Sequence, residues 1–238
     1  MEGAQPVGPD EWHSFLGNAI GGLREAAELL RTRKTQFEAK SDWFRKRKRE
    51  IPRENSVSQA LATLFEQIRS DQAISGTGTQ PVDLRHISIQ CEKPRPYDPG
   101  IGDESSPTDY ALVLLKDVEL DMRIEAKTIL DDSEVRGEYL GRRGLLRFDD
   151  RSNPYTVAPY GGMVAYVVDS DAKDWSGRIA NAVAAAVTPE RSGRMTLGCG
   201  EHQVSRHKVS VTAGGRIRDY KIEVLHFVLE IDASPPRR

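Results

Sequence analysis

The sequence has few cysteines and no long apolar segment. Its two cysteines, Cys91 and Cys199, lie far apart in the chain, which favours neither a disulfide framework nor a cysteine-rich zinc site. The longest apolar runs, at 180–187 and 224–229, are broken by polar residues or too short to cross a bilayer. The first residues also lack a basic segment followed by an apolar one. We therefore expect a cytoplasmic protein without membrane spans.

Several common catalytic signatures are also absent from the sequence. There is no phosphate loop ending in Gly-Lys-Ser or Gly-Lys-Thr, no Gly-x-Ser-x-Gly elbow and no His-Glu-x-x-His pair. His202 and His207 are five residues apart in a predicted strand, where they point to opposite faces and do not suit a metal site. His207 lies between Arg206 and Lys208 and is a candidate DNA contact.

The composition is typical of a soluble globular protein. Of its 238 residues, 38% are hydrophobic and 29% are charged. We find no internal repeat and no change in composition strong enough to divide the chain. The sequence therefore predicts one continuous α/β (α+β) unit, in which residues 1–52 form an N-terminal helical region and residues 53–238 form the main domain.

Basic residues are concentrated towards the end of the N-terminal region. The stretch from Arg31 to Arg49 holds nine basic and two acidic residues, a net charge of +7, which leaves −9 on the rest of the chain because the total is −2. Such a run is either a solvated helix surface or a contact for nucleic-acid phosphates. The candidates for nucleic-acid binding are the five consecutive basic residues Arg45, Lys46, Arg47, Lys48 and Arg49.

The spacing of apolar residues predicts the regular elements. Intervals of three and four residues predict a first helix beginning near Asp10, which could cap it, with a bend or close packing at Gly21 and Gly22. A second helix begins at Glu54 or Asn55. The segment 137–148 gives no clear pattern, and 163–168 is a buried helix or strand. A later helix covers 171–187, and alternation predicts strands over 82–91, 110–115, 118–130, 194–199, 203–211 and 220–231.

Glu54 occupies an unexpected position at the start of the second predicted helix. Counting back from Leu61 through Val57 places its carboxylate at the end of the buried stripe, where a solvated polar residue is not expected. One explanation is a first-turn glutamate that is stabilised by the helix dipole. The other is that Glu54 belongs to a site, and the spacing leaves both open.

Two acids and a lysine are expected to converge on one pair of strands. Glu125 and Lys127 point to the same side of a predicted strand, because side chains repeat every two residues. Asp109 stands at the start of the preceding strand, so antiparallel pairing would bring its carboxylate beside that of Glu125. Two adjacent carboxylates favour a hard cation such as Mg²⁺, and a neighbouring lysine can stabilise a phosphate or hold an attacking water. These groups suit metal-assisted phosphodiester hydrolysis.

The arrangement resembles the signature of the PD-(D/E)xK nuclease superfamily. The residues that carry the resemblance are Pro107-Thr108-Asp109, then a strand, then Ile124-Glu125-Ala126-Lys127. The pattern departs in one place, since Thr108 stands before the aspartate and the proline is displaced to 107. The resemblance implies a restriction-endonuclease-like fold, in which a central mixed sheet is flanked by helices. It also implies that Asp109 and Glu125 bind Mg²⁺ (or Mn²⁺), that Lys127 is the catalytic lysine and that Glu54 is an auxiliary ligand.

From this resemblance we expect a Mg²⁺-dependent nuclease that acts on DNA. The chain has little room for a domain that reads sequence, so targeting would come from a homodimer or from a helicase or ATPase partner, as in bacterial antiviral defence. One alternative is a catalytically inactive module of the same fold that binds nucleic acid or a protein, with its acids paired to Lys127 and Arg123. Another is an adaptor whose basic helix contacts an acidic partner.

Overall fold

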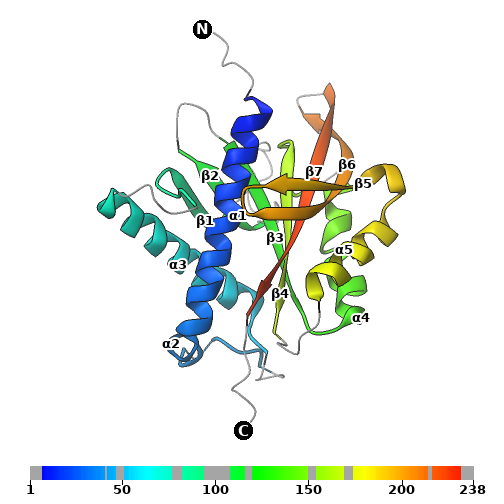
Figure 1. The fold of residues 1–238 in the computed structure, drawn as a ribbon. Helices are drawn as coiled ribbons and strands as arrows, with labels where there is room; N and C mark the ends of the chain where they lie inside the picture. Colours follow the sequence, from blue (N-terminus) through cyan, green and yellow to red (C-terminus); the bar gives the residue numbers. More distant parts are fainter. Residues whose placement is uncertain are drawn as a thin grey trace.

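The computed structural model describes residues 7–40, 42–46, 51–76, 82–93, 108–115, 120–149, 154–168, 174–213 and 216–231. These residues form a mixed α/β protein with one seven-stranded sheet (Figure 1). The strands are β1 (Ile87–Lys93), β2 (Thr108–Leu114), β3 (Leu120–Ile129), β4 (Tyr160–Val167), β5 (Ser192–Leu197), β6 (Gly200–Ala213) and β7 (Arg216–Glu230). The α-helices are α1 (Pro9–Thr32), α2 (Lys34–Glu38), α3 (Glu54–Ser75), α4 (Asp132–Glu134) and α5 (Trp175–Ala186).

Three short helical turns complete the described structure: the π-helical η2 (Val135–Tyr139) and the 3₁₀ turns η3 (Leu145–Asp149) and η4 (Pro189–Arg191). Together with α4, η2 and η3 occupy the connection between β3 and β4, where the glycine-rich sequence gave no clear pattern. None of the helices in the described ranges is long and apolar enough to cross a membrane.

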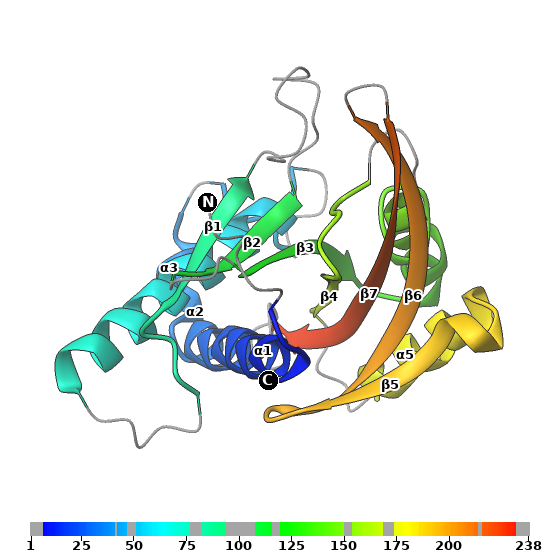
Figure 2. The same ribbon diagram turned by 90° about the horizontal axis from the view of Figure 1, so that it is seen from above.

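The sheet is mostly antiparallel and has a parallel centre. Its strand order is β1-β2-β3-β4-β7-β6-β5. The pairs β3–β4 and β4–β7 are parallel, and the other four pairs are antiparallel. The sheet is strongly curved, with α1 on the inside of the curve (Figure 2). Because β3 and β4 are parallel, the end of β3 that carries Glu125 and Lys127 lies beside the end of β4.

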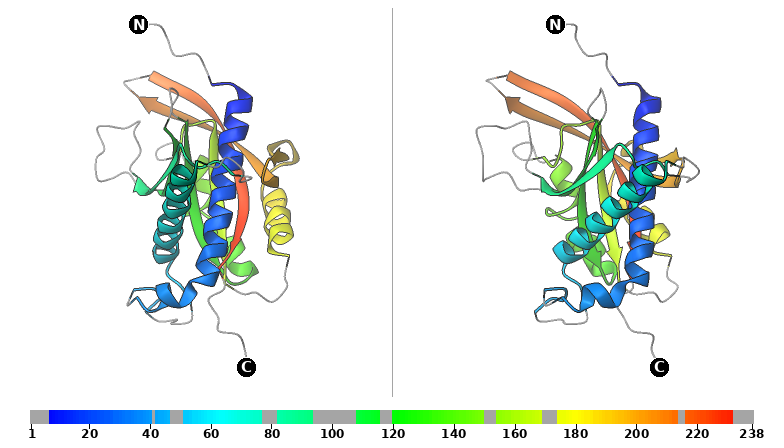
Figure 3. Two further views of the ribbon diagram at one scale, coloured as in Figure 1. Left: turned by 60° about the vertical axis from the view of Figure 1, so that its left-hand side comes forward. Right: turned by 90° about the vertical axis from the view of Figure 1, so that its left-hand side faces the viewer.

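Helices cover the sheet on both faces. One face packs against α1 and α3, which lie side by side (Figure 3), and the core between them includes Leu23, Phe65 and Ile124. The other face packs against α5, η2 and η3 around Tyr139 and Trp175. The N-terminal helix therefore shares one hydrophobic core with the sheet.

The first helix begins earlier than predicted, and its packing accounts for the two glycines in its middle. Gly8, not Asp10, is the N-cap residue, and its backbone N–H donates to the Glu11 carboxylate at 3.1 Å. The prediction of close packing at the glycine pair is confirmed, because a Cβ at Gly21 would lie 2.6 Å from Val82 and a Cβ at Gly22 would lie 2.6 Å from Phe65. Each glycine lowers the stability of the helix relative to alanine, but its missing side chain lets Val82 and Phe65 pack against the helix backbone.

The prediction of a strand over 82–91 is wrong in its first half, because β1 begins only at Ile87. The backbone before it is bound by a helix side chain. The Gln72 amide donates to the carbonyl of Val82 at 2.9 Å and accepts the N–H of Leu84 at 2.8 Å. Both apolar side chains are buried against the helices, so the alternating pattern marks burial here and not pairing. The ambiguous segment 163–168 falls largely within β4.

Candidate active site

The register of β2 and β3 places Asp109 opposite Glu125. Tyr110 pairs with Ile124 and Ala111 with Arg123, so the next position along the two strands is Asp109 against Glu125. Residues directly opposite in an antiparallel pair point to the same face of the sheet. The two carboxylates therefore lie on the face that also carries Lys127, as the alternation of the sequence predicts.

Side-chain carboxylates replace the strand ladder where β2 and β3 separate. Asp109 Oδ2 accepts the backbone N–H of Ala126 at 2.8 Å. Two residues further along β3, Glu54 Oε2 accepts the backbone N–H of Thr128 at 3.0 Å. These bonds satisfy two β3 donors that would otherwise lack acceptors. Glu54 is thus both the first residue of α3 and a member of this cluster. The two explanations of its position, as a first-turn residue and as a site residue, are therefore compatible.

Lys127 contacts two of the three carboxylates. Its Nζ lies 2.5 Å from Glu125 Oε1 and 3.4 Å from Glu54 Oε1, and it also donates to the carbonyl of Ala126 at 2.9 Å. Lys127 and Glu125 are only 7% and 8% exposed, while Asp109 and Glu54 are partly exposed. The structure therefore brings all four predicted catalytic side chains into one group near the C-terminal end of β3.

The group carries an excess of negative charge in a desolvated place. Burial, reinforced by the charges of Glu125 and Glu54, raises the pKa of Asp109 to about 8. Burial also raises the pKa of Glu125, although the Lys127 ammonium opposes this. For Lys127 itself, burial lowers the pKa, but Glu125, Glu54 and Asp109 together outweigh burial and raise it. One cation thus contacts two carboxylates beside a third, that of Asp109, whose raised pKa means that the site favours either a proton or a further positive charge.

The donor set suits a hard divalent ion. Mg²⁺ takes oxygen ligands and is commonly held by one or two carboxylates together with water. Asp109 and Glu125 supply such a pair, and Glu54 lies close enough to act on the charge of Asp109. Within the described ranges, no group of three or more His, Cys, Asp or Glu side chains is placed to hold a metal ion. The candidate ligands are therefore one pair of carboxylates completed by water, and not a closed protein cage.

Tyr155 lies beside this group, and the sequence did not reveal it as a neighbour. Its side chain is 2% exposed, and its hydroxyl donates to the carbonyl of Arg143 at 2.9 Å. Burial and the adjacent Glu125 carboxylate raise the pKa of the phenol. The Arg147 guanidinium lies 5.0 Å from the ring centroid. Tyr155 follows no periodic pattern, so only the tertiary structure shows its position next to Glu125.

A pocket of about 530 Å³ opens beside Glu54 and Lys127. Its residues come from β3, from the start of α3 and the segment before it, and from α4, η2 and the turn that follows; they are Arg45, Arg53, Glu54, Asn55, Lys127, Thr128, Glu134, Glu138 and Arg143. Of the five predicted nucleic-acid contacts, Arg45 lines this pocket and Lys46 is exposed. Arg47, Lys48 and Arg49 lie outside the described residues.

A second polar group has the contacts of a serine-hydrolase triad but not its access. His207 Nδ1 lies 3.1 Å from Asp149 Oδ1, and His207 Nε2 lies 2.8 Å from Ser205 Oγ. The same serine hydroxyl lies 2.8 Å from His226 Nε2, and Ser205 is fully buried, so it cannot reach a substrate. The prediction that His207 contacts DNA is wrong, because the side chain is 2% exposed and fixed within this network.

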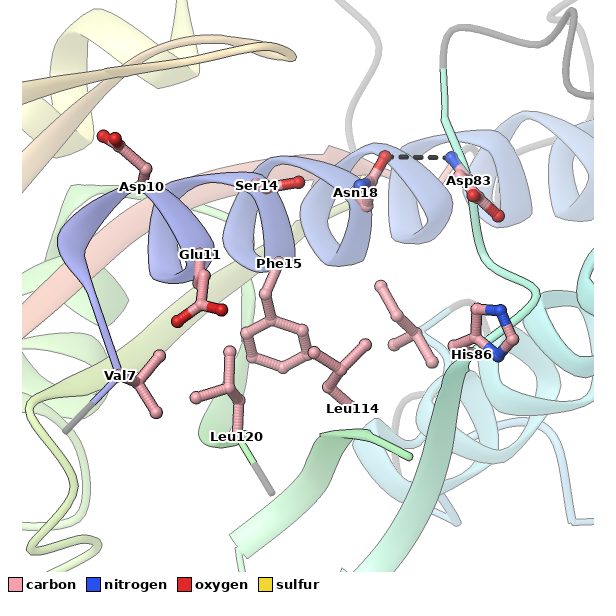
Figure 4. A pocket seen from close by; sticks show the side chains of 11 residues that line it. Val7, Asp10, Glu11, Ser14, Phe15, Asn18, Asp83, His86, Leu114 and Leu120 are labelled. Atoms are coloured by element: carbon pink, nitrogen blue, oxygen red, sulfur yellow. Dashed lines mark hydrogen bonds between the residues drawn. The ribbon is translucent and has the colours of Figure 1, made fainter. Parts of the chain in front are cut away.

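A second large pocket, of about 550 Å³, lies between the start of α1 and the edge of the sheet (Figure 4). Its floor is apolar, with Phe15, Leu114 and Leu120. Its polar rim is occupied by local bonds: Glu11 binds the N–H of Gly8, and Asp83 forms an ion pair with Arg85 at 2.8 Å. This pocket lies away from the three carboxylates, and although Ser14 and His86 both line it, no hydrogen bond joins them among the described residues.

Comparisons with protein-family models, with curated proteins and with solved structures give no significant match to this chain.

Proposed function

We propose that the protein is a metal-dependent nuclease that hydrolyses phosphodiester bonds in DNA. The observation that carries this proposal is the group of Asp109, Glu125 and Lys127, with Lys127 Nζ 2.5 Å from Glu125 Oε1 where β2 and β3 separate. The order of elements also supports it. An α-helix that begins with Glu54 is followed by β1, by β2 with the aspartate and by β3 with the Glu-x-Lys pair. We accordingly propose a restriction-endonuclease-like fold.

In this proposal each side chain has a distinct task. Asp109 and Glu125 would hold Mg²⁺ (or Mn²⁺), with Glu54 as an auxiliary ligand. The bound ion supplies Lewis-acid chemistry and lowers the pKa of water. Lys127 is held as an ammonium by its carboxylate neighbours, so it stabilises the negative charge that develops on the phosphate and orients the attacking water. The water oxygen bonds to phosphorus and one ester P–O bond breaks, which leaves a phosphate monoester and a free hydroxyl.

Cleavage of supercoiled plasmid DNA in Mg²⁺ tests this proposal. We expect Asp109→Asn, Glu125→Gln and Lys127→Ala each to slow cleavage by about 100-fold or more, since each removes a group that acts on the transition state. Asp219→Asn, which changes an exposed acid on β7, should cleave at the wild-type rate. Circular dichroism and thermal melting would confirm that each variant folds. Unchanged rates in the three site variants, or cleavage of RNA but not of DNA, would contradict the proposal.

A non-catalytic binding module is the second candidate, and one observation favours it. The polar groups of the cluster already satisfy one another: Glu125 binds Lys127, while Asp109 and Glu54 each accept a backbone N–H. A purely structural network would have the same bonds. A wild-type protein that binds DNA but does not cut it in Mg²⁺ or Mn²⁺, alone or with partners, would support this second function.

We also propose that targeting depends on assembly. The sheet and its helices take up most of the described chain, so selection of DNA would come from a homodimer or from a helicase or ATPase partner, as in an antiviral defence effector. We expect the purified protein to cleave DNA without sequence preference. Mapping of the cut sites by sequencing, with the mass in solution measured by light scattering, checks this. Sequence-specific cleavage by a lone monomer would overturn it.

A further inference from the structure

The pocket beside Lys127 carries arginines on separate elements. Arg45 and Arg53 belong to the segment between α2 and α3, and Arg143 belongs to the turn between η2 and η3. Arg53 and Arg143 are exposed. Arg53 makes a long contact of 3.5 Å with the exposed Asp42, and Arg143 has no ion pair within the part of the chain that the structure describes. Their guanidinium groups are therefore available to a ligand in the pocket.

Thr128 adds a hydrogen-bonding group that the protein leaves unused. It lines the pocket and is only 3% exposed. Its Oγ1 is buried and has no hydrogen-bond partner among the described residues. A buried hydroxyl without a partner costs free energy and is uncommon in native structures. Rotation about χ1 moves the hydroxyl between staggered positions, so Thr128 can donate to a group that enters the pocket.

The pocket carries three arginines and three acids. The arginines are Arg45, Arg53 and Arg143, and the acids are Glu54, Glu134 and Glu138, while Lys127 is already paired with Glu125. Glu54 accepts the N–H of Thr128, and Glu134 accepts the N–H of Leu130 at 2.6 Å, so both acids are bound to the backbone at the end of β3. The exposed guanidinium forks of Arg53 and Arg143 therefore remain to bind the single negative charge of a phosphodiester.

We infer that this pocket holds the DNA backbone next to the bond that is cut. Arg53 and Arg143 bind the neighbouring phosphate from the two segments, and Thr128 donates a hydrogen bond to it. The inference rests on the proposed nuclease function, because it takes Lys127 as the group beside the scissile phosphate. Since Lys127 lines the same pocket, a strand that reaches the three carboxylates passes Thr128 and the arginines.

Binding without cleavage tests this assignment. The probe is a short fluorescent DNA duplex, with the matching single strand as a second probe, and its anisotropy is measured in EDTA so that no metal-dependent cutting occurs. We expect Arg53→Ala and Arg143→Ala each to weaken binding by about tenfold, since each removes a charged hydrogen bond. Each should also reduce the slope of log affinity against log salt by about one contact. Arg218→Ala, an exposed arginine at the start of β7, is the matched control and should bind as wild type does.

Thr128→Val separates a ligand-binding hydroxyl from a structural one. Valine keeps the shape and removes a hydroxyl that has no described partner, so we expect unchanged or higher thermal stability together with several-fold weaker binding. Equal losses in Arg218→Ala and Arg143→Ala, or wild-type binding in all three pocket variants, would overturn the assignment. A protein that binds DNA through these residues but never cuts it would reject the nuclease function and keep the binding site. A protein that cuts DNA at the wild-type rate without these residues would keep the nuclease function and reject the binding site.

Discussion

Replacing Lys127 with methionine will lower the free energy of unfolding by about 3–5 kcal/mol at neutral pH, the range for removing one partner of a buried ion pair. Lys127 is the one cation within 3.4 Å of both Glu125 and Glu54 among the described residues. Methionine has a similar volume but leaves the carboxylate of Glu125, which is 8% exposed, without its partner. Urea denaturation in EDTA, followed by circular dichroism, measures the loss.

The double variant Glu125→Gln/Lys127→Met separates lost charge balance from lost packing. It removes the uncompensated carboxylate and keeps the side-chain volumes close to wild type, so it should recover a large part of the stability that Lys127→Met loses. Packing alone would make the double variant at least as unstable as the single one. If Lys127→Met unfolds at the wild-type urea concentration, Glu125 does not depend on Lys127 for its charge, and the cluster has a different electrostatic balance.

The sequence predicts this cluster because its members are close in the chain. Asp109 and Glu125 belong to consecutive antiparallel strands, and alternation alone decides which side chains share a face. Glu54 lies further away, but its place on a clearly amphipathic helix marks it as unusual. Short-range periodicity therefore predicts α3, β2 and β3 well. It also predicts a mixed α/β architecture, which the structure confirms at that level.

Other parts of the structure depend on contacts between distant segments. The pairing of β4 with β7 joins strands about sixty residues apart, and no local pattern identifies such a partner. The positions of Tyr155 and Arg143 near the carboxylates follow from the connection between β3 and β4, whose glycines hide any period. The alternation over 82–91 predicts too long a strand. The first part of this segment alternates because its apolar side chains are buried, but its backbone binds the Gln72 side chain and not a neighbouring strand.

Acid will destabilise the protein through histidines that are buried without charge. Burial, aided by nearby His207, lowers the pKa of His226 to about 3, and burial with the charge of Arg24 lowers that of His202 to about 4. In the unfolded chain a histidine has a pKa of about 6.5, so below that pH the unfolded state binds protons that the folded state does not bind. The contribution of these histidines to the free energy of unfolding is therefore fully present above pH 6.5. It falls as the pH decreases, by about 1.4 kcal/mol per pH unit for each histidine.

His226→Gln will remove about half of this acid sensitivity. His226 is held between the hydroxyl of Tyr139 at 3.1 Å and that of Ser205 at 2.8 Å, and glutamine keeps a polar group there without a titrating one. Urea midpoints measured from pH 8 down to pH 4.5 should fall less steeply for the variant, even if its stability at pH 8 is lower. Asp149, whose contacts with His207 and Arg191 outweigh burial and lower its pKa, remains in both proteins, so its contribution cancels in the comparison. Parallel curves for the variant and the wild type would mean that His226 accepts its proton in the folded state, and that the network of His207, Ser205 and Tyr139 opens to water in acid.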